Sequence, residues 1–260
     1  MTLRWVPGWN GLTEPEAVSY VAAVEAADGQ ELEFGVAKAI NDFVLGCKND
    51  GIWDAIKASC ILAGARTLSG ALVPLVGTAP TNYNFAAENY DRKTGLVGDG
   101  STKSLDSNRL CSSDAIDNHH QSVFITTINT ANTAFSHNYI GAVTSGNVRG
   151  LVTLSSTGQH AAISNSTTVV EFGSTPPLAG FFGYERNSNS TFNARLENTT
   201  FISGNLGNVD IVNSVFVFQR GDGRYTNGRL AFYSIGESLD LAALDTRVSA
   251  LITAIGAAIP

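Results

Sequence analysis

The sequence is poor in charged residues, and its charge is mostly acidic. Only 15% of its 260 residues are Asp, Glu, Lys or Arg, and 16 basic against 23 acidic residues give a net charge of −7. It has no basic block of the kind that neutralises phosphates, so we expect no nucleic-acid partner. With 43% hydrophobic residues, the chain is too apolar for a disordered protein and long enough to bury a core.

Long apolar runs and paired cysteines are also missing. No stretch of 18 apolar residues occurs, and residues 1–8 lack the apolar core of a signal peptide, so we expect neither a membrane span nor secretion. The three cysteines, Cys47, Cys60 and Cys111, form no C-x-x-C motif, which argues against a zinc site or a redox pair. Cys47 and Cys60 are expected to be buried in helices, as reduced thiols that suit a cytosol.

The motifs of several enzyme classes are absent. The segment 95–104 superficially resembles a phosphate loop, but Thr102 stands before Lys103, where a P-loop requires glycine. The E-x-D-x-x-E string that places glucanase carboxylates on one strand face is missing, as is the G-x-S-x-G elbow of serine hydrolases. The chain is therefore predicted not to be an enzyme and to need no cofactor.

Histidines and acidic residues do not form a metal-binding pattern. His119 and His120 are adjacent, so on a strand they point to opposite faces and cannot share one ion. We expect these two, with His137 and His160, to be polar edge residues. Asp and Asn oxygens in loops could hold calcium, but no loop has the dense acidic spacing of a dedicated site.

Helical periodicity occupies both ends of the chain. Apolar residues at spacings of three and four predict one helix that begins near Glu16 and stops at Gly29, and a second helix over 32–46. The spacing of apolar residues over 52–61 predicts a third helix. A last helix follows Ser238, its expected cap, and carries one apolar stripe that ends near Ile255.

The middle of the chain has the pattern of antiparallel strands. Short runs of β-branched and aromatic residues alternate with Gly, Asn and Ser, with no helical segment between them. Gly221–Gly223 is typical of a hairpin turn, and the run 214–219 suits a central strand covered on both sides. The predicted strands are 121–128, 135–143, 151–155, 160–164, 167–172, 179–186, 191–197, 200–202, 214–219 and 229–235.

Two stretches resemble known families. Residues 40–56 and 72–77, followed by Gly95-Leu-Val-Gly-Asp-Gly-Ser-Thr-Lys-Ser-Leu105, resemble bacteriophage and prophage structural proteins, in which a helix, G-I-W, helix preface leads into a strand pair around G-D-G-S-T. The segment 228–236 and the helix after it look like the closing strand and helix of concanavalin A-like lectin/glucanase (laminin-G-like) jelly rolls. The resemblance implies a virion protein on a carbohydrate-binding type of scaffold.

Pattern and resemblance together predict the fold and its divisions. We expect a mainly β protein, an antiparallel jelly-roll β-sandwich of the concanavalin A-like type, with an N-terminal helical module and a C-terminal helix. Residues 1–78 would form the arm and helical module, 79–236 the sandwich, and 237–260 the C-terminal helix. That helix would either pack on the body or lie at an assembly interface.

Candidate binding residues lie where strands are predicted to end. Sugar recognition combines an aromatic platform with Asn, Asp or Arg side chains, and loops concentrate such sites. The alternative is that these segments are ordinary solvated loops. The candidate glycan contacts are Tyr184, Arg186, Asn187, Asp222, Arg224 and Tyr225.

The resemblance also implies partners and a location. The expected function is a non-enzymatic phage structural protein on the tail or capsid surface, folded in the host cytoplasm, with virion proteins and further copies of itself as partners. A glycan-binding receptor-binding protein is the first alternative, and a degenerate polysaccharide hydrolase the second. The candidate assembly residues are Trp5, Trp9, Leu241, Leu244 and Val248.

Overall fold

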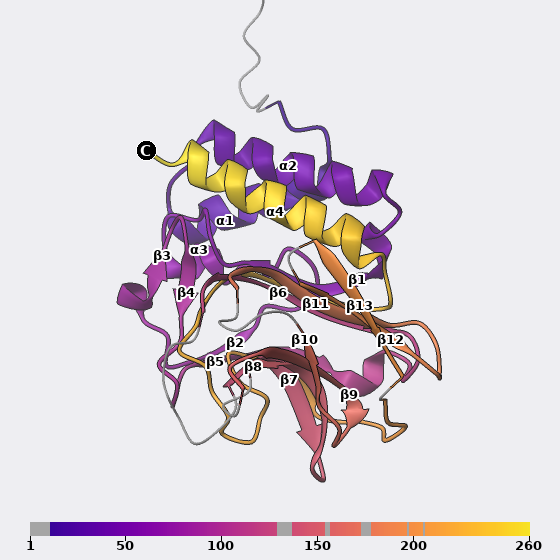
Figure 1. Cartoon of the computed structure of the whole chain (residues 1–260). Helices are drawn as coiled ribbons and strands as arrows, with labels where there is room; N and C mark the ends of the chain where they lie inside the picture. The colour runs from indigo at the N-terminus through magenta and orange to yellow at the C-terminus, as the bar shows by residue number, and fades with distance from the viewer. Residues whose placement is uncertain (1–10, 129–136, 154–156, 173–177, 197, 205) are drawn as a thin grey trace, which may run out of the picture.

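The chain folds into two facing antiparallel sheets with a layer of helices over one of them (Figure 1). The computed structural model describes residues 11–128, 137–153, 157–172, 178–196, 198–204 and 206–260. Trp5 and Trp9, predicted assembly residues, lie outside this range. The mainly β, sandwich-type architecture with helices at both ends of the chain is confirmed.

The sheet that the helices cover, called sheet A, has the order β13-β12-β11-β6-β15-β4-β3, and β1 also pairs with β15. Its central strands are long and mostly buried on both faces. The bounds are β1 Ile56–Ile61, β3 Tyr90–Asp91, β4 Gly95–Val97, β6 His119–Thr127, β11 Gly180–Arg186, β12 Phe192–Leu196, β13 Thr199–Ser203 and β15 Arg229–Gly236.

The second sheet, sheet B, has the order β10-β9-β8-β7-β14-β5-β2. All of its pairings are antiparallel, and consecutive strands β7 to β10 are neighbours. The bounds are β2 Thr81–Tyr83, β5 Ser104–Leu110, β7 His137–Thr144, β8 Asn147–Thr153, β9 His160–Ser166, β10 Val170–Phe172 and β14 Ser214–Val217.

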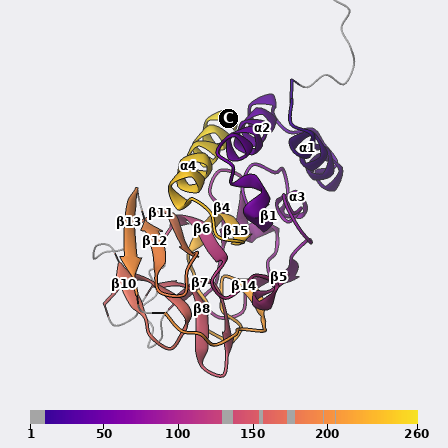
Figure 2. The same ribbon diagram turned by 90° about the vertical axis from the view of Figure 1, so that its right-hand side faces the viewer.

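Three long helices form the third layer. They are α1 (Pro15–Asp28), α2 (Phe34–Asn49) and α4 (Leu241–Ala258). A fourth, short helix is α3 (Leu68–Ala71). Gly29 ends α1 in the left-handed conformation that glycine adopts without strain. Figures 1 and 2 show α2 and α4 side by side above sheet A. Single turns of 3-10 helix occur at Trp53–Ala55, Ala87–Asn89 and Cys111–Ser113.

The strands of sheet A under the helices separate two apolar cores. On β11, Phe181 belongs to the core under the helices, whereas Phe182 and Tyr184 belong to the core between the sheets. This division follows from the strand period of two residues. Residue parity along β11 therefore decides which side chains face the helices.

Residues 52–61 were predicted to be helical, and this prediction is wrong. Ile56–Ile61 is strand β1, paired antiparallel with β15 at the centre of sheet A. Ile56 and Ile61 face the helices, and Ala58 and Cys60 face the sandwich core. Because both faces are covered, the strand has no polar alternation, and its apolar spacing imitated that of a helix. Cys60 accordingly lies in a strand.

Two glycine turns connect the sheets instead of forming hairpins. The Gly221–Gly223 turn lies between β14 of sheet B and β15 of sheet A, and the Gly98–Gly100 turn lies between β4 of sheet A and β5 of sheet B. In the second turn the Asp99 carboxylate accepts hydrogen bonds from the backbone N–H groups of residues 101–103. The expected hairpin at 221–223 and the expected strand pair around Asp99 are therefore corrected.

Helix α4 packs on its own chain. By length and composition alone it could cross a membrane, with a mean hydropathy of 1.4 over 18 residues. Its apolar stripe, however, is buried against α2 and sheet A, and Leu241, Leu244 and Val248 belong to the core under the helices. Within this chain their apolar surface is thus already covered, and an assembly contact through these three residues stays a prediction.

Candidate functional site

The predicted glycan contacts on β11 are interior residues. Tyr184 and Arg186 have no exposed surface, because their parity turns them toward the sandwich core. The Arg186 guanidinium donates to the carbonyl oxygens of Ser188 and Gly207 and to Oδ1 of Asn208. Both residues are therefore corrected from surface contacts to buried ones.

The other predicted loop, 220–225, is exposed, and its charges pair within the loop. The Arg220 guanidinium makes two hydrogen bonds of 2.9 and 2.8 Å to the Asp222 carboxylate. Arg224 Nε lies 3.6 Å from the same carboxylate. The Tyr225 carbonyl accepts a hydrogen bond of 3.1 Å from His137 Nδ1. The loop thus gathers the Arg220, Asp222 and Arg224 side chains, whereas Tyr225 is fixed through its backbone.

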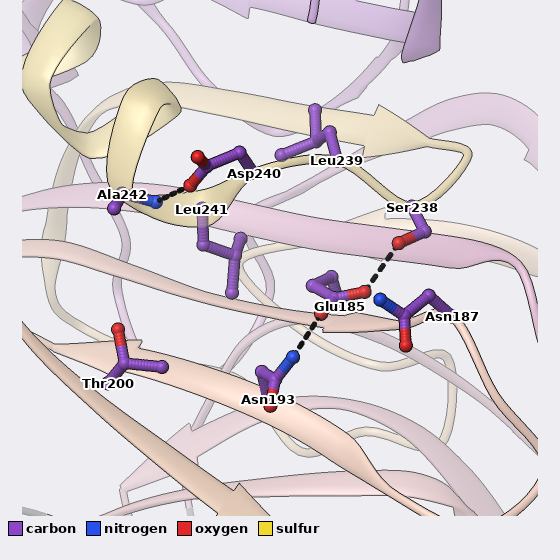
Figure 3. Close-up of a pocket in the computed structure, with 9 residues that line it drawn as sticks. All are labelled: Glu185, Asn187, Asn193, Thr200, Ser238, Leu239, Asp240, Leu241 and Ala242. Atoms are coloured by element: carbon purple, nitrogen blue, oxygen red, sulfur yellow. Dashed lines mark hydrogen bonds between the residues drawn. The ribbon is translucent and has the colours of Figure 1, made fainter.

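Asn187 is exposed and lines a hollow of about 470 Å³, which we call the α4 pocket. The pocket lies where β11, β12 and β13 meet the turn that leads into α4 (Figure 3). Sheet strands and a helix start thus supply its walls, as in many binding sites built on rigid elements. The lining residues are Glu185, Asn187, Asn193, Thr200, Ser238, Leu239, Asp240, Leu241 and Ala242.

Glu185 is the buried polar centre of the α4 pocket. It shares the helix-facing side of β11 with Phe181 and is only 4% exposed. Asn193 Nδ2 donates to one carboxylate oxygen and Ser238 Oγ to the other (Figure 3). Across the described ranges, no Lys, Arg or His nitrogen lies within 4.0 Å of this carboxylate. Neutral hydrogen-bond donors alone therefore hold a mostly buried carboxylate.

The start of α4 forms the opposite wall of the pocket. Asp240, rather than the predicted Ser238, caps the helix, and its Oδ1 accepts from the backbone N–H groups of Ala242 and Ala243 at 2.8 and 3.2 Å. Ser238 is instead held over Glu185, and its own N–H donates to Asn118 Oδ1 at 2.9 Å. The cap and this turn fix the wall without a ligand.

The buried histidine His120 supports the same turn from below. Its Nδ1 donates to the Glu237 carbonyl at 2.6 Å, so its neutral Nε2 accepts from Ser234 Oγ at 2.7 Å. Burial lowers the pKa of His120 to about 4. His119, His137 and His160 are buried as well, so the expectation of polar edge histidines is corrected.

The pocket offers a defined set of chemical groups. Glu185, Asn187 and Thr200 present oxygens and an amide that can bond hydroxyl groups, while Leu239 and Leu241 supply apolar surface. Among the described residues, none that lines it is basic or aromatic. Within the chain that the structure describes, no group of three or more His, Cys, Asp or Glu residues could hold a metal ion.

Sequence reasoning missed Glu185, although it stands between two of the predicted contacts. The signal lies in the alternation of β11: Phe182, Tyr184 and Arg186 share one face, so Glu185 must occupy the other. Asn187 was the one predicted contact of this strand that the structure places in the pocket.

Comparisons with known proteins bear on the fold. No family model matches the chain, and no curated protein matches its sequence. Its structure is similar to the botulinum neurotoxin serotype D binding domain (TM-score 0.50, 12% identity, 76% of this chain and 51% of that one). A structure of the receptor binding domain of botulinum neurotoxin D gives the same TM-score and identity, with 76% and 52% covered.

A third similar structure is domain 4 of AbnA, a GH43 extracellular arabinanase from Geobacillus stearothermophilus, in complex with arabinotriose (TM-score 0.47, 15% identity, 65% of this chain and 82% of that one). The chain spans about half the length of the two botulinum neurotoxin chains. At 12% identity, the likeness to those two chains shows a shared β-sandwich fold.

Proposed function

We propose that this protein is a carbohydrate-binding protein that holds a neutral glycan in the α4 pocket. The observation that carries the proposal is the Glu185 carboxylate, which is mostly buried, has no cation partner among the described side chains, and lies in a hollow of about 470 Å³. A carboxylate in that position can accept hydrogen bonds from sugar hydroxyl groups, which then take the place of water molecules.

The charge of the lining indicates the class of sugar. Glu185 and Asp240 are acidic, and no Lys, Arg or His lines the pocket to offset them. A sugar with a carboxylate or sulfate would meet like charge in a partly desolvated site, which costs free energy. Uncharged hexoses or pentoses suit this lining better, with Leu239 and Leu241 against the apolar face of the ring.

Binding without hydrolysis fits the two carboxylates of the pocket. Glycoside hydrolysis needs one carboxylic acid and a second carboxylate free to act as base or nucleophile. Asp240 Oδ1 is engaged by two backbone N–H groups of α4, and both oxygens of Glu185 accept hydrogen bonds. We therefore propose a non-enzymatic role.

The proposal is tested by titration of the full chain with neutral and acidic oligosaccharides, followed by isothermal calorimetry and NMR. Glu185→Gln preserves the shape of the side chain, and Asn187→Ala removes an exposed amide of the same pocket. Asp222→Asn in the 220–225 loop is the matched control, because it changes one acidic residue at the competing predicted site.

We expect a neutral oligosaccharide to bind the wild type. Its affinity for Glu185→Gln should be about tenfold lower or more, because one charge-assisted hydrogen bond to the sugar is lost. Asp222→Asn should bind like the wild type. Loss of binding in Asp222→Asn alone would place the site in the loop. Absence of binding to every neutral sugar would contradict the proposal, and release of reducing sugar would contradict its non-enzymatic part.

Placement of the protein on a phage tail or capsid, with virion proteins or further copies as partners, stays a prediction of the sequence resemblance. The same holds for the jelly-roll, concanavalin A-like type of the sandwich. A glycan-binding function is compatible with such a location, since a surface protein of a particle can contact host glycans.

A further inference from the structure

One end of the sandwich interior is polar and contains two buried arginines. Three cross-strand pairs meet there: Arg186 lies opposite His119, Tyr184 opposite Gln121, and Arg149 of sheet B opposite Ser164. We call these six residues the Arg149 cluster. All six are at most 1% exposed, and their strand parity turns them toward the space between the sheets.

The members of the cluster lie close together across the two sheets. The rings of His119 and Tyr184 are 5.6 Å apart, edge to face. Arg149 reaches over from β8: its Nη1 donates to the Cys111 carbonyl at 2.9 Å and its Nε to Asn165 Oδ1 at 3.0 Å. Burial, and next the charge of Arg149, hold the pKa of His119 well below its usual value.

Neither arginine of the cluster has a carboxylate partner. The hydrogen bonds of both guanidinium groups go to carbonyl and amide oxygens, and no carboxylate among the described residues lies within 4.0 Å of Arg149 or Arg186. Elsewhere the same chain pairs its buried cation directly, as in Arg195 with Asp245. Two guanidinium groups inside the sandwich are thus left without a directly bonded carboxylate, and the Asp117 charge acts on Arg186 only from farther away. Burying a charge in this way is costly in a low-dielectric interior.

A backbone strap closes this end of the sandwich. Residues 206–210 cross it, held by Arg186 through Gly207 and Asn208 and by Asn165 Nδ2, which donates to the Val209 carbonyl. The strap lies so close that a Cβ on Gly207 would be 2.0 Å from the Asn165 carbonyl oxygen. The Arg149 cluster is therefore shielded from bulk solvent by a segment that its own arginine fastens.

Several polar atoms of the cluster have no hydrogen-bond partner among the described residues. The donors are Arg149 Nη2, Gln121 Nε2, Tyr184 Oη and Ser164 Oγ, and the acceptors are Gln121 Oε1 and His119 Nε2. Each such group costs folding free energy if it stays unpartnered, because it has given up its hydrogen bonds to water. Arg149 Nη2 and Gln121 Nε2 can only donate, the two hydroxyl groups can donate or accept, and the Arg149 guanidinium brings a positive charge to this point. Water could satisfy the hydrogen bonds, but only an anion would also offset the charge.

We propose that the Arg149 cluster binds a small inorganic anion of the size of chloride between the two sheets. Arg149 Nη2 supplies the charge-assisted hydrogen bond, and the neutral donors of Gln121, Tyr184 and Ser164 complete the coordination. The bound anion is a structural element of the sandwich end and is separate from the α4 pocket, which lies on the opposite face of sheet A.

Two measurements on the full chain test the proposal. Crystals soaked in sodium bromide are examined for an anomalous peak inside the cluster. Thermal unfolding is followed in increasing sodium chloride, with sodium gluconate added to hold the ionic strength constant, because gluconate is too large for the site. The variants are Arg149→Met, which removes the charge at similar length, and Arg224→Met in the 220–225 loop as its control.

We expect a bromide peak beside the Arg149 guanidinium and a saturable rise of about 2–4 °C in the unfolding temperature with chloride. Arg224→Met should keep this rise, and Arg149→Met should lose it. If Arg149→Met does not fold, the bromide peak in the wild type decides. Ordered water in place of a peak, with equal unfolding temperatures in chloride and gluconate, would overturn the proposal.

Discussion

Arg195 and Asp245 form a buried ion pair that joins strand β12 to helix α4. Arg195 Nε lies 2.8 Å from Asp245 Oδ2, and the two side chains are 10% and 5% exposed. Arg195 also donates to Thr200 Oγ1, which lines the α4 pocket, and Asp245 accepts from Ser249 Oγ. The pair therefore fixes the helix over the strands whose side chains build the pocket.

Replacing Asp245 by Asn should destabilise the protein by about 3–5 kcal/mol, because Arg195 is left buried without a counter-ion. Urea unfolding measures the change. The control is Asp50→Asn, which breaks the more exposed Arg247–Asp50 pair and should cost about 1 kcal/mol or less. Equal losses in the two variants would show that burial of the first pair has no energetic consequence.

Truncation of Leu244 tests whether α4 belongs to the core. Leu244 has no exposed surface, so Leu244→Ala should lower the free energy of unfolding by about 2–5 kcal/mol. Thr246→Ala, on the exposed side of the same helix, should change it by less than about 0.5 kcal/mol. Light scattering should give the same solution mass for wild type and both variants. A mass that falls only in Leu244→Ala would instead point to an assembly contact.

Mild acid should destabilise the fold through its buried histidines. The pKa of His120 is lowered to about 4 by burial, and burial also lowers the pKa values of His119 and His160. Between pH 6.5 and about 4 the unfolded chain binds more protons than the folded one. The stabilising contribution is therefore complete above pH 6.5 and is lost as the pH falls, by up to about 1.4 kcal/mol per pH unit for His120, with the other two histidines acting in the same direction.

Urea unfolding at pH 7.0 and pH 5.5, above the range in which most carboxylates titrate, measures this loss. His120→Gln, which can still bond to Ser234 and to the Glu237 carbonyl, should show a smaller difference between the two pH values than the wild type. An identical difference would mean that His120 takes up its proton as readily when folded as when unfolded.

The three cysteines should be unreactive in the native protein. All are buried free thiols, and burial raises the pKa of Cys47 and Cys60 to about 12 and that of Cys111 to about 11. Because the thiolate is the reactive form, iodoacetamide at pH 8 should label them only at the rate of unfolding. Labelling in urea gives the count of three for reference. Rapid native labelling of any of them would contradict its buried position.

Much of the secondary structure could be predicted locally. The ten predicted strand segments between residues 121 and 235 all overlap strands, with residues 135, 136, 154, 155 and 197 of those segments outside the described part of the chain. Helices α1, α2 and α4 begin and end near their expected residues. Turn residues and short alternating runs mark strand ends without reference to the rest of the chain. Strand β1 was not predicted, because two different cores cover its faces and its sequence therefore lacks the alternation of polar and apolar residues.

The functional surface was harder to predict, because a strand pattern shows that two faces exist but not what covers each of them. On β11, Tyr184 and Arg186 entered the sandwich interior, and Glu185 came to line a pocket beside α4. That outcome depends on where a helix 50 residues later in the chain docks, as the contact from Arg195 to Asp245 illustrates.

The sequence by itself thus determined the class of the protein: weak charge, short β-rich runs and glycine turns between helical ends specify a β-sandwich with helices, because these are local preferences of the backbone. Only the tertiary structure decided which sheet each strand joined, that the turns at 98–100 and 221–223 cross between sheets, and which polar residues became buried. Those features arise from contacts between residues far apart in the chain. The free energy gained by burying and pairing these residues is larger than the free energy of local backbone preferences.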